Sequence, residues 1–180
     1  MSGLADVVVG TGATITENLS PGTYYLIDTA NPPSGPPPVT TLTVKPAKAG
    51  IEQDSDLVSQ TTVSATSADR FVVSRRTWPH QGTLTFRNTS DTLHFMSLTP
   101  VKTGTTDQDV TKYFNSGSKN PPPFLRPGPS IGNDVTSPGV SLQLSYNLPK
   151  GTYVALCFIA DDVTGMPHAI MGMHKVVVLN

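Results

Sequence analysis

Short extended segments separated by turn residues dominate the hydrophobic pattern of this chain. Apolar and β-branched runs alternate with clusters of Gly, Pro, Asn, Asp and Ser, a pattern typical of strands. The strands expected on this basis are 7–9, 14–16, 22–28, 39–44, 57–65, 70–74, 82–88, 94–100, 141–148, 153–159 and 175–179. Residues 105–114 are the one helical candidate, because Thr106 or Asp107 can cap them. The pattern therefore predicts an all-β protein: a Greek-key sandwich or barrel of two sheets with one short helix and long loops.

The chain is expected to divide into three parts. Residues 1–46 form an N-terminal β extension, residues 47–58 a polar linker and residues 59–180 the main domain. Segment 18–28 (NLSPGTYYLID) parallels segment 147–157 (NLPKGTYVALC) at a constant offset of 129 residues. We interpret the extension as the remnant of a sister domain, or as a duplicated sheet edge. The alternative is that N-L-x-x-G-T-Y is simply a common way to enter a strand.

Composition narrows the class of protein. A length of 180 residues with 37% apolar residues suits one domain of ordinary size. A net charge of −1 gives no basic surface, so we do not expect a nucleic-acid partner. No run approaches the ~20 apolar residues of a membrane span. No secretory signal opens the chain. Only 14% of residues are charged and Thr, Ser and Val abound, which fits a β-rich extracytoplasmic protein. The candidate site discussed below leads us to expect a trimmed form of an exported protein.

The side chains with distinctive chemistry gather in the last thirty residues. This stretch holds the only cysteine, two of the four histidines and three of the five methionines. Cys157, His168 and Met173 offer a thiolate, an imidazole and a thioether, which is the ligand set that copper favours. A copper site of this kind needs a second imidazole from a distant strand, and His94 is the candidate because it follows a predicted strand and a polar turn.

The same residues give the chain a resemblance to the cupredoxin family over about its last two thirds. The matching features are Asn88 before the turn that carries His94, a Gly-Thr-Tyr strand leading to Cys157, and then His168 and Met173. The resemblance implies that His94, Cys157 and His168 are equatorial copper ligands and Met173 the axial one. It also implies that the Asn88 amide supports the His94 loop or the Cys157 loop. The ten residues between Cys157 and His168 exceed the spacing of plastocyanin-like members.

Other residues near these positions have competing interpretations. A lone cysteine on an apolar strand is usually a buried hydrophobic residue, and only the combined pattern favours a ligand at Cys157. Met171 can replace Met173 as the axial ligand if the segment is extended. His174 is expected to be exposed and is a weaker candidate for a ligand. Met96 is expected in the core. The first segment lacks a His or Met after the position equivalent to Cys157, so the sister domain is expected to be metal-free.

These observations lead to one main functional hypothesis and two alternatives. The main hypothesis is a mononuclear copper protein of the cupredoxin type that transfers electrons in a periplasmic or secreted location. Its redox partner is expected at the His168 edge, beside Met166, Ala169 and Ile170. We do not expect an enzyme, because four protein ligands leave no open position for a substrate. The alternatives are a copper(I) carrier or sensor, with a copper donor or acceptor as partner, and a metal-free structural or interaction module.

Overall fold

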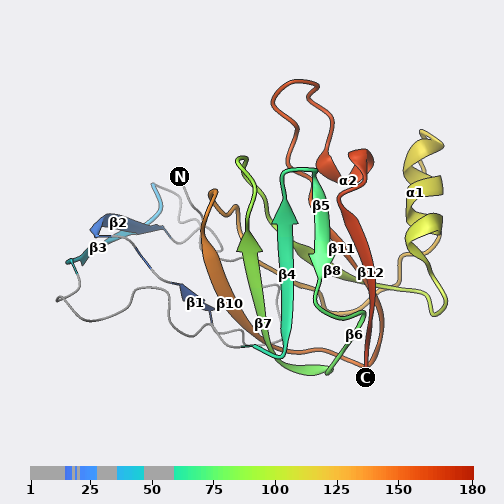
Figure 1. The fold of residues 1–180 in the computed structure, drawn as a ribbon, viewed down its shortest axis with the longest axis horizontal. Coiled ribbons are helices and arrows are strands. Elements are labelled where there is room, and N and C mark those ends of the chain that lie inside the picture. Colours follow the sequence, from blue (N-terminus) through green and yellow to red (C-terminus); the bar gives the residue numbers. More distant parts are fainter. Residues whose placement is uncertain (1–14, 18, 20, 28–35, 47–58) are drawn as a thin grey trace. The chain divides into compact units, whose positions relative to one another are not determined.

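The computed structural model describes residues 15–17, 19, 21–27, 36–46 and 59–180, and strands dominate it (Figure 1). The strands are β1 (Ile15–Glu17), β2 (Gly22–Ile27), β3 (Val39–Val44), β4 (Thr61–Thr66), β5 (Arg70–Val73), β6 (Thr77–Trp78), β7 (Gln81–Asn88), β8 (Ser97–Val101), β9 (Ile131–Gly132), β10 (Ser141–Asn147), β11 (Gly151–Leu156) and β12 (His174–Leu179). The helices are α1 (Asp107–Asn115) and α2 (His168–Met171).

Two five-stranded sheets form the main unit. The first sheet has the order β1-β10-β7-β4-β5 and the second the order β6-β12-β11-β8-β9. The chain crosses to the second sheet at β6, returns to the first at β7, crosses again at β8, returns at β10 and crosses a last time at β11. Strands that are neighbours in a sheet are therefore mostly distant in sequence, as in a Greek key. The predicted all-β, two-sheet fold is confirmed.

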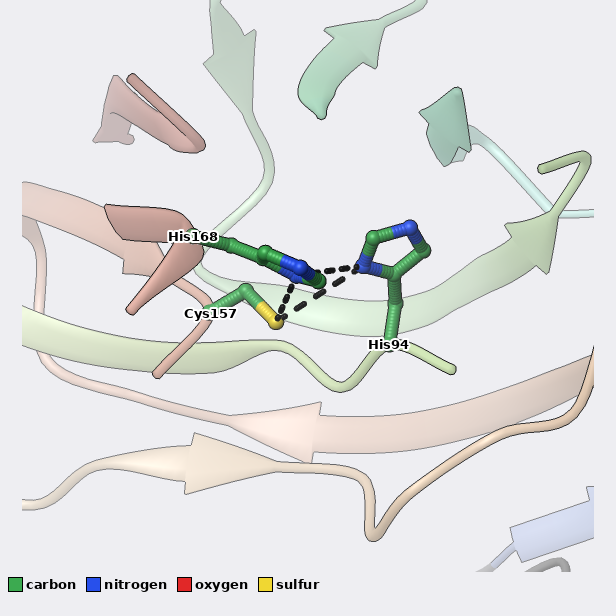
Figure 2. A group of neighbouring side chains, drawn as sticks. All are labelled: His94, Cys157 and His168. Atoms are coloured by element: carbon green, nitrogen blue, oxygen red, sulfur yellow. Dashed lines mark hydrogen bonds between the residues drawn. The ribbon is translucent and has the colours of Figure 1, made fainter. Parts of the chain in front are cut away.

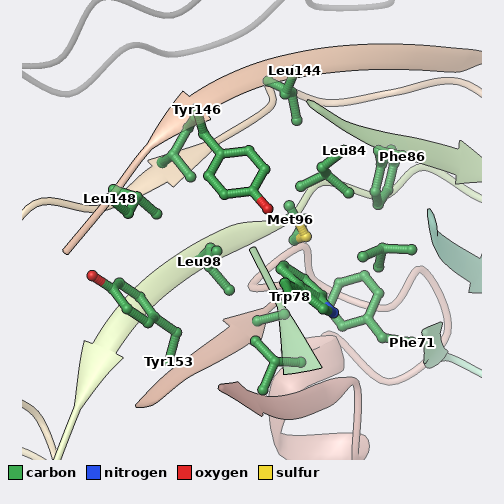
Figure 3. Close-up of a cluster of buried hydrophobic side chains, with 14 of the residues drawn as sticks. Phe71, Trp78, Leu84, Phe86, Met96, Leu98, Leu144, Tyr146, Leu148 and Tyr153 are labelled. Carbon is green, nitrogen blue, oxygen red and sulfur yellow. The ribbon is translucent and has the colours of Figure 1, made fainter. Parts of the chain in front are cut away.

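The core lies between the two sheets, because each strand turns its alternate side chains inward. In β10, Leu142, Leu144 and Tyr146 are buried and alternate with partly exposed residues. Figure 3 shows the resulting core, in which Phe71 and Phe86 pack edge to face with ring centroids 6.4 Å apart. Cys157 and Met173 belong to this cluster as well.

A second cluster covers the outer face of the second sheet. It joins side chains of β8, α1, β11, α2, β12 and the loop between α1 and β9: Val101, Val110, Phe124, Val154, Leu156, Ala169 and Val176. Strand β11 is consequently buried on both faces, since its side chains meet the core on one side and this cluster on the other. Cys157, which directly follows β11, thus emerges from the most enclosed strand of the fold.

The N-terminal residues fall into two units. Strand β1 pairs with β10 and belongs to the main unit, whereas β2 and β3 form a separate two-stranded sheet. Strand β2 begins and ends 129 residues before β11 does, which is the offset between the two similar sequence segments. Each of the two strands pairs with an antiparallel neighbour over six residue pairs. This equivalence favours duplication, which stays a prediction. Residues 7–9, 28 and 47–58 lie outside the described residues.

The structure refines several predicted elements near one end of the sandwich. Strand β8 begins at Ser97 instead of residue 94, and His94 forms an isolated bridge with Thr136. Helix α1 begins at a capping box in which Thr106 and Asp109 satisfy each other's backbone N–H groups. Helix α2 was not predicted. Neither described helix is long and apolar enough to cross a membrane.

Truncating a core ring should destabilise the whole main unit. Phe86 is fully buried against Phe71, so Phe86→Ala is expected to lower the free energy of unfolding by about 3–5 kcal/mol. Val72 is 56% exposed, and Val72→Ala is expected to change the free energy of unfolding by about 0.5 kcal/mol or less. Urea unfolding followed by tryptophan fluorescence measures both. Similar losses for the two variants would contradict the placement of the core.

Candidate metal centre

Three buried side chains bring their donor atoms together at one end of the sandwich. Cys157 Sγ lies 3.8 Å from His94 Nδ1 and 3.8 Å from His168 Nδ1, and the two Nδ1 atoms are 3.1 Å apart (Figure 2). His94 and Cys157 are fully buried and His168 is 2% exposed. The residues lie 63 and 11 positions apart along the chain. The fold thus produces the predicted convergence of one thiol and two imidazoles.

The dimensions of this triangle suit a metal ion. With bond lengths known for zinc, about 2.0–2.1 Å to imidazole nitrogen and about 2.3 Å to thiolate sulfur, a planar trigonal site needs N···N of roughly 3.5 Å and N···S of roughly 3.8 Å. The N···S distances of 3.8 Å agree, and the N···N distance of 3.1 Å is slightly shorter. Two imidazoles, a thiolate and a nearby methionine are the residue set of a type 1 copper site.

Backbone hydrogen bonds fix Cys157 against the segment that carries the other C-terminal candidates. The Cys157 N–H donates to the Met173 carbonyl at 3.3 Å, and the Cys157 carbonyl accepts from the Ala169 N–H at 2.6 Å. The His168 N–H donates to the Ile159 carbonyl at 2.9 Å. Because these bonds involve only backbone, they set the position of the side chains whatever ion is present.

The ten residues between Cys157 and His168 form a pinched turn. Ala160 and Pro167 pair as an isolated bridge, and the Asp161 N–H donates to the Met166 carbonyl at 2.9 Å. The Asp161 carboxylate accepts from the N–H and the hydroxyl of Thr164, each at 2.6 Å. The extra length is thus folded into a closed turn, and Pro167 returns the chain next to Cys157.

His94 is held from the opposite side by a polar network. His94 and Thr136 exchange two backbone hydrogen bonds, at 3.2 and 2.7 Å. The Asn88 amide donates to the Thr92 carbonyl at 2.8 Å and to the Thr136 carbonyl at 2.9 Å. The Thr92 hydroxyl lies 3.1 Å from His94 Nε2. Asn88 therefore contacts the His94 loop, one of the two loops considered for it.

The remaining methionine and histidine candidates take different positions. Met173 is fully buried, and its backbone is bonded to Cys157 and His168; its ligand role stays a prediction. The condition under which Met171 could replace Met173 is not met, because the segment is not extended there: Met171 ends helix α2, and its sulfur accepts from the Thr164 hydroxyl at 3.9 Å. The expectation that His174 is exposed is also wrong: it is 8% exposed, and its Nε2 lies 3.1 Å from the Thr111 hydroxyl.

Burial shapes the protonation of the centre. Burial, together with the neighbouring His168, lowers the pKa of His94 from 6.5 to about 4. Burial raises the pKa of the Cys157 thiol, and backbone hydrogen bonds at Phe95 and Ile159 act in the opposite direction. At neutral pH the metal-free centre therefore holds a neutral thiol and a neutral His94, and a metal ion has to displace the thiol proton.

One residue of the centre was not found from the sequence. Asp69 Oδ1 lies 3.9 Å from His94 Nε2 and 3.9 Å from His168 Nε2. Asp69 sits in the three-residue turn between β4 and β5, where an aspartate normally signals only a turn. Thr92, Thr136 and their hydrogen bonds were missed for a similar reason, because threonines in loops carry no periodic signal.

The surface next to His168 differs partly from the prediction. Ala169 is fully buried and packs in the outer cluster, so it does not line the surface. Met166 and Ile170 are 45% and 38% exposed. Phe158, at 48%, and Val163, at 87%, add further exposed apolar area on the same segment.

No family model and no curated protein matches this sequence. Among solved structures, it is similar to dithionite-reduced auracyanin from the photosynthetic bacterium Roseiflexus castenholzii, with 21% identity and a TM-score of 0.39 over 66% of this chain and 94% of that one. Auracyanin B has 21% identity and a TM-score of 0.41, and the match covers 66% of this chain and 86% of that one. The third is auracyanin A, a "blue" copper protein from the green thermophilic photosynthetic bacterium Chloroflexus aurantiacus. It has 16% identity and a TM-score of 0.38, and the match covers 66% of this chain and 96% of that one.

The metal-free protein should lose stability in mild acid. The pKa of His94 is 6.5 unfolded and about 4 folded, so the unfolded state binds the proton first as the pH falls. The stability from this group is full above pH 6.5 and is lost as the pH falls through about 4. The loss should reach about 3 kcal/mol in urea unfolding between pH 7 and pH 4.

Burial also lowers the pKa of His174, so this residue adds a further loss of folding stability as the pH falls. His94→Gln should remove most of the pH dependence, whereas His80→Gln, at a partly buried position outside the centre, should leave it unchanged. If the free energy of unfolding falls equally with pH in the His94→Gln variant and in the unchanged protein, His94 is not the group responsible.

Proposed function

We propose that this protein is a mononuclear copper protein of the type 1 kind that transfers single electrons. The observation that carries the proposal is the triangle of Cys157 Sγ and two imidazole Nδ1 atoms, with edges of 3.8, 3.8 and 3.1 Å. In this proposal His94, Cys157 and His168 are the equatorial ligands. Met173 is the axial ligand, supported by its complete burial and its backbone bonds to Cys157 and His168.

The donor set favours copper over other common ions. Structural zinc sites are usually tetrahedral with four strong donors, whereas this group contains one thiol and two imidazoles. A thiolate and a thioether suit Cu(I), and imidazole suits both Cu(I) and Cu(II). A site that accepts both oxidation states can cycle between them without exchanging ligands.

The protein's own contribution is a rigid and dry cage. When bound, copper would supply the one-electron couple. The backbone bonds of Cys157 to Ala169 and Met173 hold the donors in place, which keeps rearrangement between the two states small. The buried donors exclude bulk water, and Cys157 would bind copper as the thiolate after loss of its thiol proton. If Nδ1 of His94 held the ion, its Nε2 would carry the proton and would donate to the Thr92 hydroxyl, 3.1 Å away.

We further propose an extracytoplasmic location and a redox partner that docks beside His168. The exposed apolar side chains of Phe158, Val163, Met166 and Ile170 support such a contact, because they lie on the chain segment that carries His168. A copper(I) carrier remains the second candidate, supported by the exposed thioether of Met166. A metal-free module is the third.

Copper titration separates these functions. Adding Cu(II) to the purified chain should produce one intense thiolate-to-copper band in the visible, saturating at one equivalent. Cys157→Ser removes the only thiol and should abolish the band, whereas His80→Gln should keep it. Reversible one-electron voltammetry supports electron transfer. A colourless, air-stable Cu(I) complex supports a carrier, and an absence of bound copper in the unchanged protein supports a metal-free module.

Replacing Met173 tests the axial position. Met173→Leu conserves volume and removes the thioether, so the visible band should persist. The reduction potential should rise, because the loss of an axial electron donor destabilises the more highly charged Cu(II) more than it destabilises Cu(I). Met96 is also fully buried in the core, and Met96→Leu is the matched control that should leave the potential unchanged. Equal potentials for both variants would show that Met173 only fills space.

A further inference from the structure

A carboxylate faces the distal nitrogens of both buried imidazoles. Asp69 Oδ1 lies 3.9 Å from Nε2 of His94 and 3.9 Å from Nε2 of His168, on the side of the rings opposite Cys157. The Asp69 side chain is 22% exposed, so most of it is removed from water. Placing a charged group beside two buried rings is unfavourable unless positive charge develops there.

The turn that carries Asp69 is built to hold this position. Asp69 adopts the left-handed region with φ of +50°, and its N–H closes the turn on the Thr66 carbonyl at 3.0 Å. Aspartate tolerates this conformation, although glycine and asparagine fit it as well. The choice of aspartate therefore does not follow from the backbone alone.

Two contacts join this turn to the segments that carry the imidazoles. Arg70 Nη1 donates to the carbonyls of Asp69, at 2.8 Å, and of Met171, at 2.9 Å, which ties the turn to helix α2 and hence to His168. On the other side, Thr89 donates through both its N–H and its hydroxyl to the Ala65 carbonyl, which ties β4 to the His94 loop. In Figure 1 the β4–β5 turn, the loop after β7 and α2 lie at the same end of the sandwich.

We propose that the negative charge of Asp69, which lies beside the distal nitrogens of both imidazoles, lowers the reduction potential of the copper centre. The inference rests on the proposed copper function. A nearby anion stabilises Cu(II) more than Cu(I), because the oxidised centre carries one more positive charge. The two imidazoles would bind the ion through Nδ1, and their Nε2 atoms lie 3.9 Å from Asp69, so the carboxylate would act on the ion through the rings.

Two other carboxylates lie near the imidazoles, but each is near one ring only: Asp91 near His94 and Asp161 near His168. The two hydrogen bonds from Thr164 lower the pKa of Asp161 and keep it charged, so it adds to the negative charge near His168. Among the described ion pairs, Asp69 is the carboxylate that lies within 4 Å of both rings, and Arg70 donates to backbone carbonyls instead of pairing with it. The field of Asp69 also reaches the sulfur, since it contributes to the raised pKa of Cys157.

The test is voltammetry of the copper-loaded protein with Asp69→Asn. Asparagine keeps the shape and the left-handed backbone and removes only the charge. The Cu(II)/Cu(I) affinity ratio should fall about tenfold, which for a one-electron couple is a rise of about 59 mV in potential. Asp69→Gly, which also suits the backbone, should raise the potential at least as much. Asp162→Asn, at an exposed position of the neighbouring loop, is the charge-matched control and should change it little.

The salt dependence distinguishes a charge effect from a change in structure. Because Asp69 is partly exposed, the difference between Asp69→Asn and the unchanged protein should shrink as the ionic strength rises. A raised potential that shrinks with salt, with the visible band retained, supports the inference. An unchanged potential in an Asp69→Asn protein that still binds copper overturns it. Absence of the band in the unchanged protein overturns the proposed function instead.

Discussion

The backbone clamp between Cys157 and the segment 168–173 is the interaction on which the centre depends. Cys157 donates to Met173 and accepts from Ala169, so a single residue is bonded to both ends of the segment that carries His168. Gly172 makes this possible, because its φ of +112° turns the chain back into β12. A Cβ at that position would lie 2.8 Å from the Arg70 guanidinium carbon, which itself ties the β4–β5 turn to the same segment.

This arrangement places polar chemistry inside an apolar core. A thiol, a neutral imidazole and the network around Asn88 are all buried, and each needs its partners to avoid a desolvation cost. The Asn88 side chain meets this need with four contacts, two as donor and two as acceptor from Ser90. Burying these polar groups thus costs part of the stability gained from the two hydrophobic clusters. This cost grows as the pH falls, because the lowered pKa of His94 means that the folded protein resists protonation of the ring.

The sequence was most informative where chemistry and periodicity agree. Cys157, His168 and His94 were predicted because soft and borderline donors at strand ends are rare, and the two-sheet fold brought them together. The burial of His174 was missed, because alternation along β12 does not show that α1 covers its outer side, where Thr111 meets the ring. Asp69 was missed because its role comes from a tertiary contact between a turn and residues 25 and 99 positions away.

The β4–β5 turn gives the first sheet a direct influence on the centre. Among the described residues, this turn alone has a carboxylate within 4 Å of the distal nitrogen of both rings. Thr89 ties the His94 loop to β4 of the first sheet, whereas His168 lies between β11 and β12 of the second. The distance from Asp69 to His168 therefore depends on how the two sheets pack, and the contact of Arg70 with Met171 helps to fix it. The packing of the core between the sheets and the electrostatics of the centre are therefore coupled: the same interface that excludes water also sets the distance of a negative charge from the donors.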